Sequence, residues 1–466
     1  MPGQTGSTTS TAMAPPPALV ATRPPVQAEL PSAADLKDKS ERENPLRKIA
    51  LYASLGFIFL RVSVLSELLL YVTHVNFYLL YLFGPPAIFG VLVTGGLGRT
   101  LRGNAAKYWM AFFLWLILST PFSSWKGGST GMALNYARFN FPMLFILAGL
   151  AMTWKEVRLI FYTFAIGAMA SLGTTRLFGK MDDEGRMRLD SSGNIGNSND
   201  LGAHLLLVLP FLIYVMLDRK RSSFLRMAMI PPIAYGVWIV LGTASRGCLL
   251  ALTIMFLFSL LRANAGQRVA ALVVGVVMAV TIPFLLPSNV RGRLSTLFSE
   301  QNQDPLLAQE ARESREAREY LFKQSVRYTV EHPLFGVGLG QFTNYEGNEQ
   351  VSEGRHGAWS VTHNFMTQIS SECGVPALIF ALLGIGSAML MVGRTYREAR
   401  KKGFRDIANA CFCYHLAMVG YLASIVFLAQ AYHYYIPAMI GLAVVMCTIA
   451  TRYMSAQETM PVAAVR

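Results

Sequence analysis

The amino-acid sequence predicts an all-α polytopic membrane protein with about 12 transmembrane helices and one large helical loop on the outer side. Its 466 residues are 53% hydrophobic and 15% charged, with a mean hydropathy of +0.38, which is unusual for a soluble protein. Apolar segments recur from Ile49 onward, each near the length needed to cross the hydrocarbon core of a bilayer. A mostly polar stretch, residues 288–374, separates the last three apolar segments from the others.

The first 45 residues have a different composition, rich in Pro, Ala, Ser and Thr and without a long apolar run. They lack the apolar core of a signal peptide, so we interpret them as a disordered cytoplasmic tail. We expect the following parts: the tail at 1–45, transmembrane helices 1–9 within 46–287, the large loop at 288–374, helices 10–12 within 375–455 and a cytoplasmic tail at 456–466.

The apolar segments predict the individual spans. They lie at roughly 49–70, 76–96, 108–122, 139–153, 157–175, 201–217, 227–243, 247–261, 269–287, 375–393, 407–428 and 435–453.

Basic residues in the loops predict that both termini face the cytoplasm. With the N-terminus inside, the inner loops hold more than twice as many lysines and arginines as the short outer loops. The outer basic residues, which stand against this bias, are Lys126, Arg138, Arg176, Lys180, Arg186, Arg188 and Arg246. The large loop is then outside, although loops of its length largely escape the charge rule.

Charge and cysteine content argue against two other classes of protein. The net charge of +14 does not indicate nucleic-acid binding, because the basic residues occur in short clusters between apolar spans. The five cysteines lack metal-ligand spacing, and we interpret them as small hydrophobic residues. We expect neither a metal nor another cofactor.

The large loop contains the most informative stretch of the sequence. A surface helix is expected over 308–331, ended by His332 and a proline. The glycines of the following segment, GVGLG at 336–340, permit tight turns and close backbone approach. His363 precedes the return to apolar sequence at Val375, which makes its imidazole a candidate proton acceptor at the membrane surface. The alternative is a histidine that hydrogen-bonds its own loop.

Four outer arginines are candidate anion-binding residues. Arg246 lies in a hairpin so short that its charge must stay near the membrane, where it needs a partner or an aqueous cavity. Its alternative is snorkelling to lipid phosphates, and Arg138 is a weaker case of the same kind. Arg186 and Arg188 lie in the 176–200 loop, whose acidic residues offer internal pairing as the alternative.

The 176–200 loop ends in GNSND (residues 196–200) at the start of the next predicted helix. Asn199 or Asp200 is expected to cap that helix, and an amide-rich helix N-terminus suits an anion.

These motifs together resemble those of the O-antigen ligase and polymerase family over residues 50–450. The resemblance rests on HPLFGVGLGQF (332–342), on HN at His363 eleven residues before GVPALIF, on SRG at 245–247 and on GNSND. In one departure, Arg188 stands five residues before Gly193, and Ser198 occupies a position that the family often fills with proline.

The resemblance implies a glycosyltransferase that takes a glycan from undecaprenyl diphosphate at the periplasmic face of a bacterial inner membrane. The implied acceptor is a hydroxyl of lipid A–core for a ligase, another lipid-linked glycan for a polymerase, or a protein hydroxyl for an O-oligosaccharyltransferase. Of these we prefer the ligase. No nucleic acid is expected as a partner.

The candidate residues suit this chemistry. A diphosphate leaving group needs its developing charge stabilised, and guanidinium binds phosphate bidentately while staying protonated. The acceptor hydroxyl needs a base, for which neutral His363 is the candidate, with His356 and Glu372 next in line. Asn364 and Glu372 are candidates for orienting the acceptor or the imidazole. Direct displacement would invert the anomeric centre.

The rival class is a lipid-linked glycan flippase or transporter. Twelve spans and a basic outer surface suit it, whereas transport pathways usually show charges within the spans or paired broken helices. Arg61 and Glu67 in the first predicted span are the main such charges.

Overall fold

The computed structural model describes Gly3, residues 40–182, 185–189, 191, 195–263, isolated positions between 268 and 280, 305–357 and 359–458. The account below concerns the unit formed by residues 43–466. Most of the predicted tail at 1–45, most of the predicted span 269–287 and residues 288–304 lie outside the described residues.

The first predicted span is broken into two helices. α2 (Pro45–Ser63) begins before the predicted Ile49 because the Asn44 side chain caps it, accepting from two backbone amides. It ends at Val64, whose φ of 58° lies in the left-handed region, and α3 (Leu65–Thr73) continues at an angle of 60°.

Short helices follow in the N-terminal third of the chain. They are α4 (Leu79–Val93), α5 (Gly96–Thr100), α6 (Asn104–Ser119), the 3₁₀ turn η1 (Thr120–Phe122), α7 (Lys126–Asn135), the π-helical turn η2 (Tyr136–Asn140) and α8 (Met143–Gly149). The span predicted at 139–153 is therefore only partly regular α-helix, because η2 covers its first two residues and α8 ends at Gly149, before the predicted end.

The middle of the chain contains α9 (Trp154–Phe178), α10 (Ser198–Leu217), α11 (Ser223–Met227), α12 (Ile230–Gly242) and α13 (Arg246–Arg262). Between α9 and α10 a short antiparallel hairpin pairs β1 (Gly179–Met181) with β2 (Met187–Leu189). The prediction of the α10 cap was wrong, because the side chain of Asn197 accepts from Asp200 N, so Asn199 and Asp200 lie inside the first turn.

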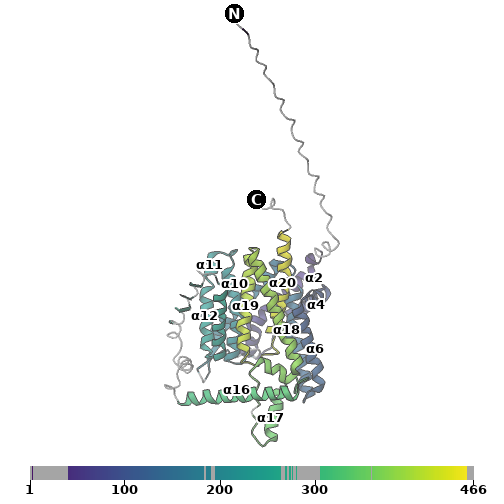
Figure 1. Cartoon of the computed structure of the whole chain (residues 1–466), viewed down its shortest axis with the longest axis vertical. Helices are drawn as coiled ribbons and strands as arrows, with labels where there is room; N and C mark the ends of the chain where they lie inside the picture. Colours follow the sequence, from purple (N-terminus) through teal and green to yellow (C-terminus); the bar gives the residue numbers. More distant parts are fainter. Residues whose placement is uncertain are drawn as a thin grey trace. The chain divides into compact units, whose positions relative to one another are not determined.

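The C-terminal part contains α16 (Pro305–Glu331), α17 (Phe342–Ser352), α18 (Phe365–Lys401), α19 (Arg405–Ile425) and α20 (Tyr435–Glu458). The helix predicted over 308–331 is confirmed as α16, which packs on α18. Figure 1 shows α16 running crosswise to α18, α19 and α20, near the ends of those helices.

Six helices in the described residues are long and apolar enough to cross a membrane: α9, α10, the α11–α12 pair, α18, α19 and α20. A seventh results if α2 and α3 count as one bent span. The chain is thus a mostly helical protein with several candidate membrane spans, and the total of 12 stays a prediction. α20 and α10 are the most buried of these spans, with 83% and 78% of their apolar 18-residue stretches buried.

The GVGLG segment, residues 336–340, packs against the N-terminal part of α18 through backbone hydrogen bonds. Val337 N donates to Ser371 O (2.8 Å) and Gly338 N donates to Glu372 O (2.9 Å), as in a pair of strands. At Gly336, φ is +68°, and an added Cβ would lie 2.3 Å from the backbone carbon of Glu372. This position therefore requires glycine both for its conformation and for space.

This packing predicts that alanine substitutions at two glycines will differ in their effect on stability. Gly336→Ala should lower the thermal stability of the purified protein far more than Gly354→Ala. Both glycines have positive φ, at +68° and +73°, but nothing lies within 4 Å of a Cβ at Gly354. Gly354→Ala should therefore cost only the left-handed strain of about 1–2 kcal/mol, whereas Gly336→Ala adds a backbone clash. Equal melting temperatures for the two variants would contradict this packing.

Candidate functional site

The segment joining α19 to α20, residues 426–434, connects helix ends that are far apart in sequence. Gln430 Nε2 donates to Asp200 Oδ1 at the start of α10 (2.7 Å). The next amide, Ala431 N, donates to Gln368 Oε1 in the first turn of α18 (3.0 Å). Two adjacent residues of this segment therefore contact the GNSND motif and the first turn of α18.

The same segment also holds the end of α2. Tyr434 OH donates to the backbone oxygen of Arg61 (2.8 Å), and its ring lies 4.5 Å below the guanidinium. The backbone oxygen of Tyr432 accepts from Asn140 Nδ2 in η2 (2.9 Å). Four regions of the chain thus meet around residues 430–434.

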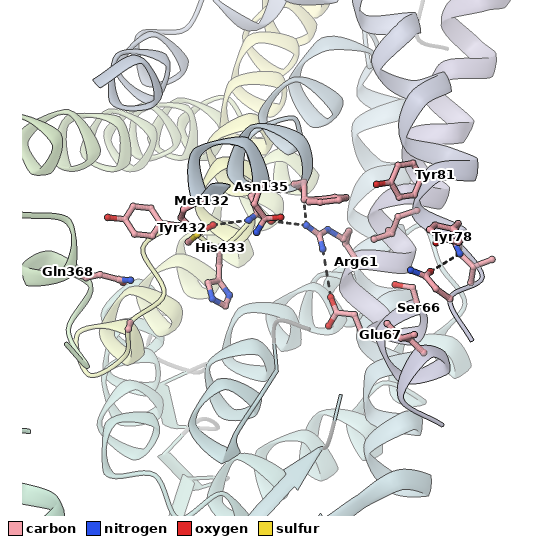
Figure 2. Close-up of a pocket in the computed structure, with 17 residues that line it drawn as sticks. Arg61, Ser66, Glu67, Tyr78, Tyr81, Met132, Asn135, Gln368, Tyr432 and His433 are labelled. Atoms are coloured by element: carbon pink, nitrogen blue, oxygen red, sulfur yellow. Dashed lines mark hydrogen bonds and ion pairs between the residues drawn. The ribbon is translucent and has the colours of Figure 1, made fainter. Parts of the chain in front are cut away.

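A pocket of about 540 Å³ lies at this meeting point. Figure 2 shows Arg61 and Glu67 on one side of it, with Tyr432, His433 and Gln368 on the other. Its polar lining is Arg61, Ser66, Glu67, Asn76, Asn135, Asn140, Gln368 and His433, and its aromatic lining is Tyr78, Tyr81, Phe139 and Tyr432. This volume and mixture are typical of small-molecule sites.

Arg61 is the charged centre of the pocket. It is 6% exposed; one terminal nitrogen donates to Phe139 O and Asn140 Oδ1 (both 2.8 Å) and the other lies 3.7 Å from Glu67 Oε1. Its buried Nε has no hydrogen-bond partner among the described residues. Sequence reasoning did not select Arg61 for this site, although a charge pair inside an apolar span was the signal for it.

Arg186 connects the 176–200 loop to the hairpin that precedes Arg246. Its guanidinium donates to Thr243 O (3.0 Å) and to Asn199 Oδ1 (2.7 Å). Arg246 is the first residue of α13, is exposed, and follows the cap residue Ser245. The structure thus brings Arg186 and the Arg246 hairpin together.

The other two candidate arginines are more peripheral. Arg188 is exposed in β2, opposite Lys180. Arg138 is exposed in η2, with its guanidinium 5.8 Å from the ring centroid of Phe139, a residue that lines the pocket.

His363 lies immediately before α18, half-buried, with a φ of 50°. Burial, and after it the Arg318 guanidinium, lowers the pKa of His363 from its ordinary 6.5. The imidazole is therefore neutral at pH 7, as a general base must be. No hydrogen bond of this imidazole is present among the described residues.

Asn364 and Glu372 have structural partners. The Asn364 side chain caps α18 by accepting from Met366 N (2.9 Å) and Thr367 N (3.0 Å). Glu372 is 4% exposed and accepts from Gly340 N (3.0 Å), so its carboxylate fastens the GVGLG segment to α18. Asn364 thus caps the helix that follows His363, and Glu372 holds the GVGLG segment against α18.

These features define a polytopic helical membrane protein with a polar pocket and candidate basic residues at helix ends. Among the described residues, no group of three or more His, Cys, Asp or Glu side chains is arranged to hold a metal.

Comparison with known protein families narrows the class of protein further than the fold does. Residues 231–382 match the family model of O-antigen ligase, a family of glycosyl-transferring enzymes, which confirms the resemblance seen in the sequence over this part of the chain. The matched stretch contains Arg246, His363, Asn364 and Glu372. A search of curated proteins found no match to the chain.

Proposed function

We propose that this protein is an O-antigen ligase that transfers a glycan from undecaprenyl diphosphate to a hydroxyl of lipid A–core. The reaction is metal-independent and takes place at the periplasmic face of the bacterial inner membrane. The donor, the acceptor and the surrounding lipids are its partners.

One observation supports this most: motifs distant in sequence converge on residues 430–434. The GNSND helix start contacts this segment through Asp200, and α18, which follows His363, contacts it through Gln368. Arg186 in turn joins the 176–200 loop to the Arg246 hairpin. A two-substrate transfer needs a phosphate-binding group and a base in one place.

The proposed roles follow from the chemistry of each side chain. His363 accepts the proton of the acceptor hydroxyl as its oxygen bonds to the anomeric carbon from the side opposite the phosphate. The carbon–oxygen bond to the phosphate breaks, the configuration inverts, and undecaprenyl diphosphate leaves. Arg246, Arg186, Arg188 and Arg138 stabilise the growing negative charge of this leaving group. Asn364 and Glu372 position His363 through the cap and the GVGLG segment.

A polymerase and a protein O-oligosaccharyltransferase use the same chemistry with another acceptor. A deletion strain separates the first from a ligase. Loss of the ligase should leave long glycan chains on the lipid carrier with none on lipid A–core, as measured by gel analysis of both fractions. Single repeats transferred to core would instead identify a polymerase, and unchanged lipopolysaccharide would contradict both.

A flippase is the second candidate, and one observation favours it. The helix break at Val64, with the buried Arg61–Glu67 pair beside it, is a feature found in transport pathways. A fluorescent lipid-diphosphate sugar in liposomes distinguishes the two, since an enzyme forms product without moving this lipid between leaflets.

A further inference from the structure

The pocket around Arg61 has no part in the proposed transfer chemistry, because none of the candidate residues His363, Arg246, Arg186 or Arg188 lines it. It nevertheless has the size of a binding site, about 540 Å³, and a polar lining drawn from the start, middle and end of the chain. The pocket is therefore a second candidate binding site, separate from the residues proposed for the transfer chemistry.

The charge in the pocket is largely balanced. Arg61 and Glu67 lie opposite each other at 3.7 Å, and carbonyl oxygens occupy one end of the guanidinium. Burial, with Arg61 adding to it, lowers the pKa of His433 to about 4, so this imidazole is neutral at pH 7. A phosphate here would lie close to the Glu67 carboxylate, which disfavours an anion.

Two residues of the lining, Arg61 and His433, each carry a buried hydrogen-bonding atom that is not used within the described part of the chain. Arg61 Nε and His433 Nδ1 are buried and have no partner among the described residues. Because both atoms are enclosed by the protein, hydrogen bonds to a ligand would come from the amide side chains of the lining, such as Asn76 and Asn135.

The remaining lining combines amides with aromatic rings. Asn135 is exposed, and the Tyr81 ring, 48% exposed, stands edge-on to Phe139 with their centroids 6.2 Å apart. Amides bond to hydroxyls in either direction, while an exposed aromatic ring offers an apolar face to C–H groups. Hydroxyls on one edge and C–H groups on one face are the surface of a sugar ring.

We propose that this pocket binds an uncharged sugar residue of one of the two glycan-bearing substrates. The inference rests on the proposed function, since that function supplies the glycans. Gln368, which lines the pocket, lies in the first turn of α18, where its backbone N donates to the backbone O of Asn364 (2.9 Å), the residue after His363. The lining residue Gln368 is thus one helical turn from Asn364, which follows the proposed base His363.

The test measures binding, so that it does not depend on turnover. The full-length protein in nanodiscs is titrated with three probes: lipid-linked glycan from a strain lacking the protein, undecaprenyl diphosphate without a glycan, and lipid A–core. The variants are Tyr81→Ala, Tyr81→Phe and Asn135→Leu. Tyr52→Ala is the matched control, because Tyr52 is also an exposed helical tyrosine, at 65%, and lies outside the pocket.

Tyr81→Ala and Asn135→Leu should each weaken binding of one sugar-bearing probe by about three- to tenfold, and the probe affected shows whether donor or acceptor supplies the sugar. Tyr81→Phe and Tyr52→Ala should bind that probe as the wild type does. The carrier without glycan should bind all variants equally.

Two results would overturn this inference: unchanged affinity for both sugar-bearing probes, or equal weakening of the sugar-free carrier. Transfer by the wild type is assayed separately. A protein that transfers glycan while its variants bind normally would keep the proposed function and lose the sugar pocket. If the Tyr81 variants lose sugar binding but the wild type transfers no glycan, the sugar pocket stands and the proposed function is wrong.

Discussion

His363→Ala should lower the turnover of glycan transfer by about 10²–10⁴-fold while donor affinity is largely kept. The imidazole is half-buried at the start of α18, and its lowered pKa leaves it neutral and able to accept the hydroxyl proton at pH 7. Steady-state rates and donor titrations on the purified variant separate the two effects. His74→Ala is the control, because His74 is an exposed histidine at the end of α3 whose φ of 56° is close to that of His363.

The pH dependence gives His363 an independent signature. A base works when unprotonated, so the rate should fall on acidification, with a midpoint below 6.5 because the pKa of His363 is lowered. Arg318→Ala removes a positive neighbour and should move this midpoint upward, whereas exposed Arg315, one turn earlier on α16, should leave it unchanged when replaced by alanine. Near-normal transfer by His363→Ala, or loss of donor affinity alone, would require another base.

Arg246→Ala should reduce transfer by about 10²–10³-fold and weaken donor binding, without changing the pH midpoint. The guanidinium stands at the exposed first position of α13, beside the hairpin that Arg186 contacts, where a diphosphate can also meet backbone amides. Lysine should restore activity only in part, because it lacks the bidentate fork.

The control for Arg246 is Arg102→Ala, an exposed arginine in the predicted inner loop. Both variants should insert into the membrane and purify normally. A loss of transfer activity in Arg246→Ala alone would then show that Arg246 takes part in the reaction and not in folding. Full activity in Arg246→Ala would instead identify this side chain as one that snorkels to lipid phosphates.

Elements with strong local signals were predictable from sequence. Continuous apolar runs placed α9, α10 and α18–α20, and α16 was recognisable from its polar, proline-ended pattern. The GVGLG glycines indicated close backbone approach, and the structure places that segment against Glu372. These features depend on residues near one another in the chain.

The Arg61 pocket was not predictable because it depends on contacts between distant segments. α2 stops at Val64 in a left-handed conformation that a β-branched residue rarely adopts, so composition gives no warning of the bend. The sequence predicts residues 430–434 only as the short connection between two spans, but their backbone and side chains join α2, α10, η2 and α18. The β1–β2 hairpin was missed for a similar reason, since strands of three residues show no alternation.

Reconstitution tests the proposed function most directly. Purified protein in lipid vesicles receives undecaprenyl-diphosphate-linked glycan and lipid A–core, without nucleotide or added metal, and products are followed by mass spectrometry. We predict equal amounts of glycan-bearing lipid A–core and free undecaprenyl diphosphate, with the rate at which both form lowered by about 10²–10⁴-fold in His363→Ala. Intact donor in both samples, or donor merely moved to the opposite leaflet, would contradict a glycosyl-transfer function.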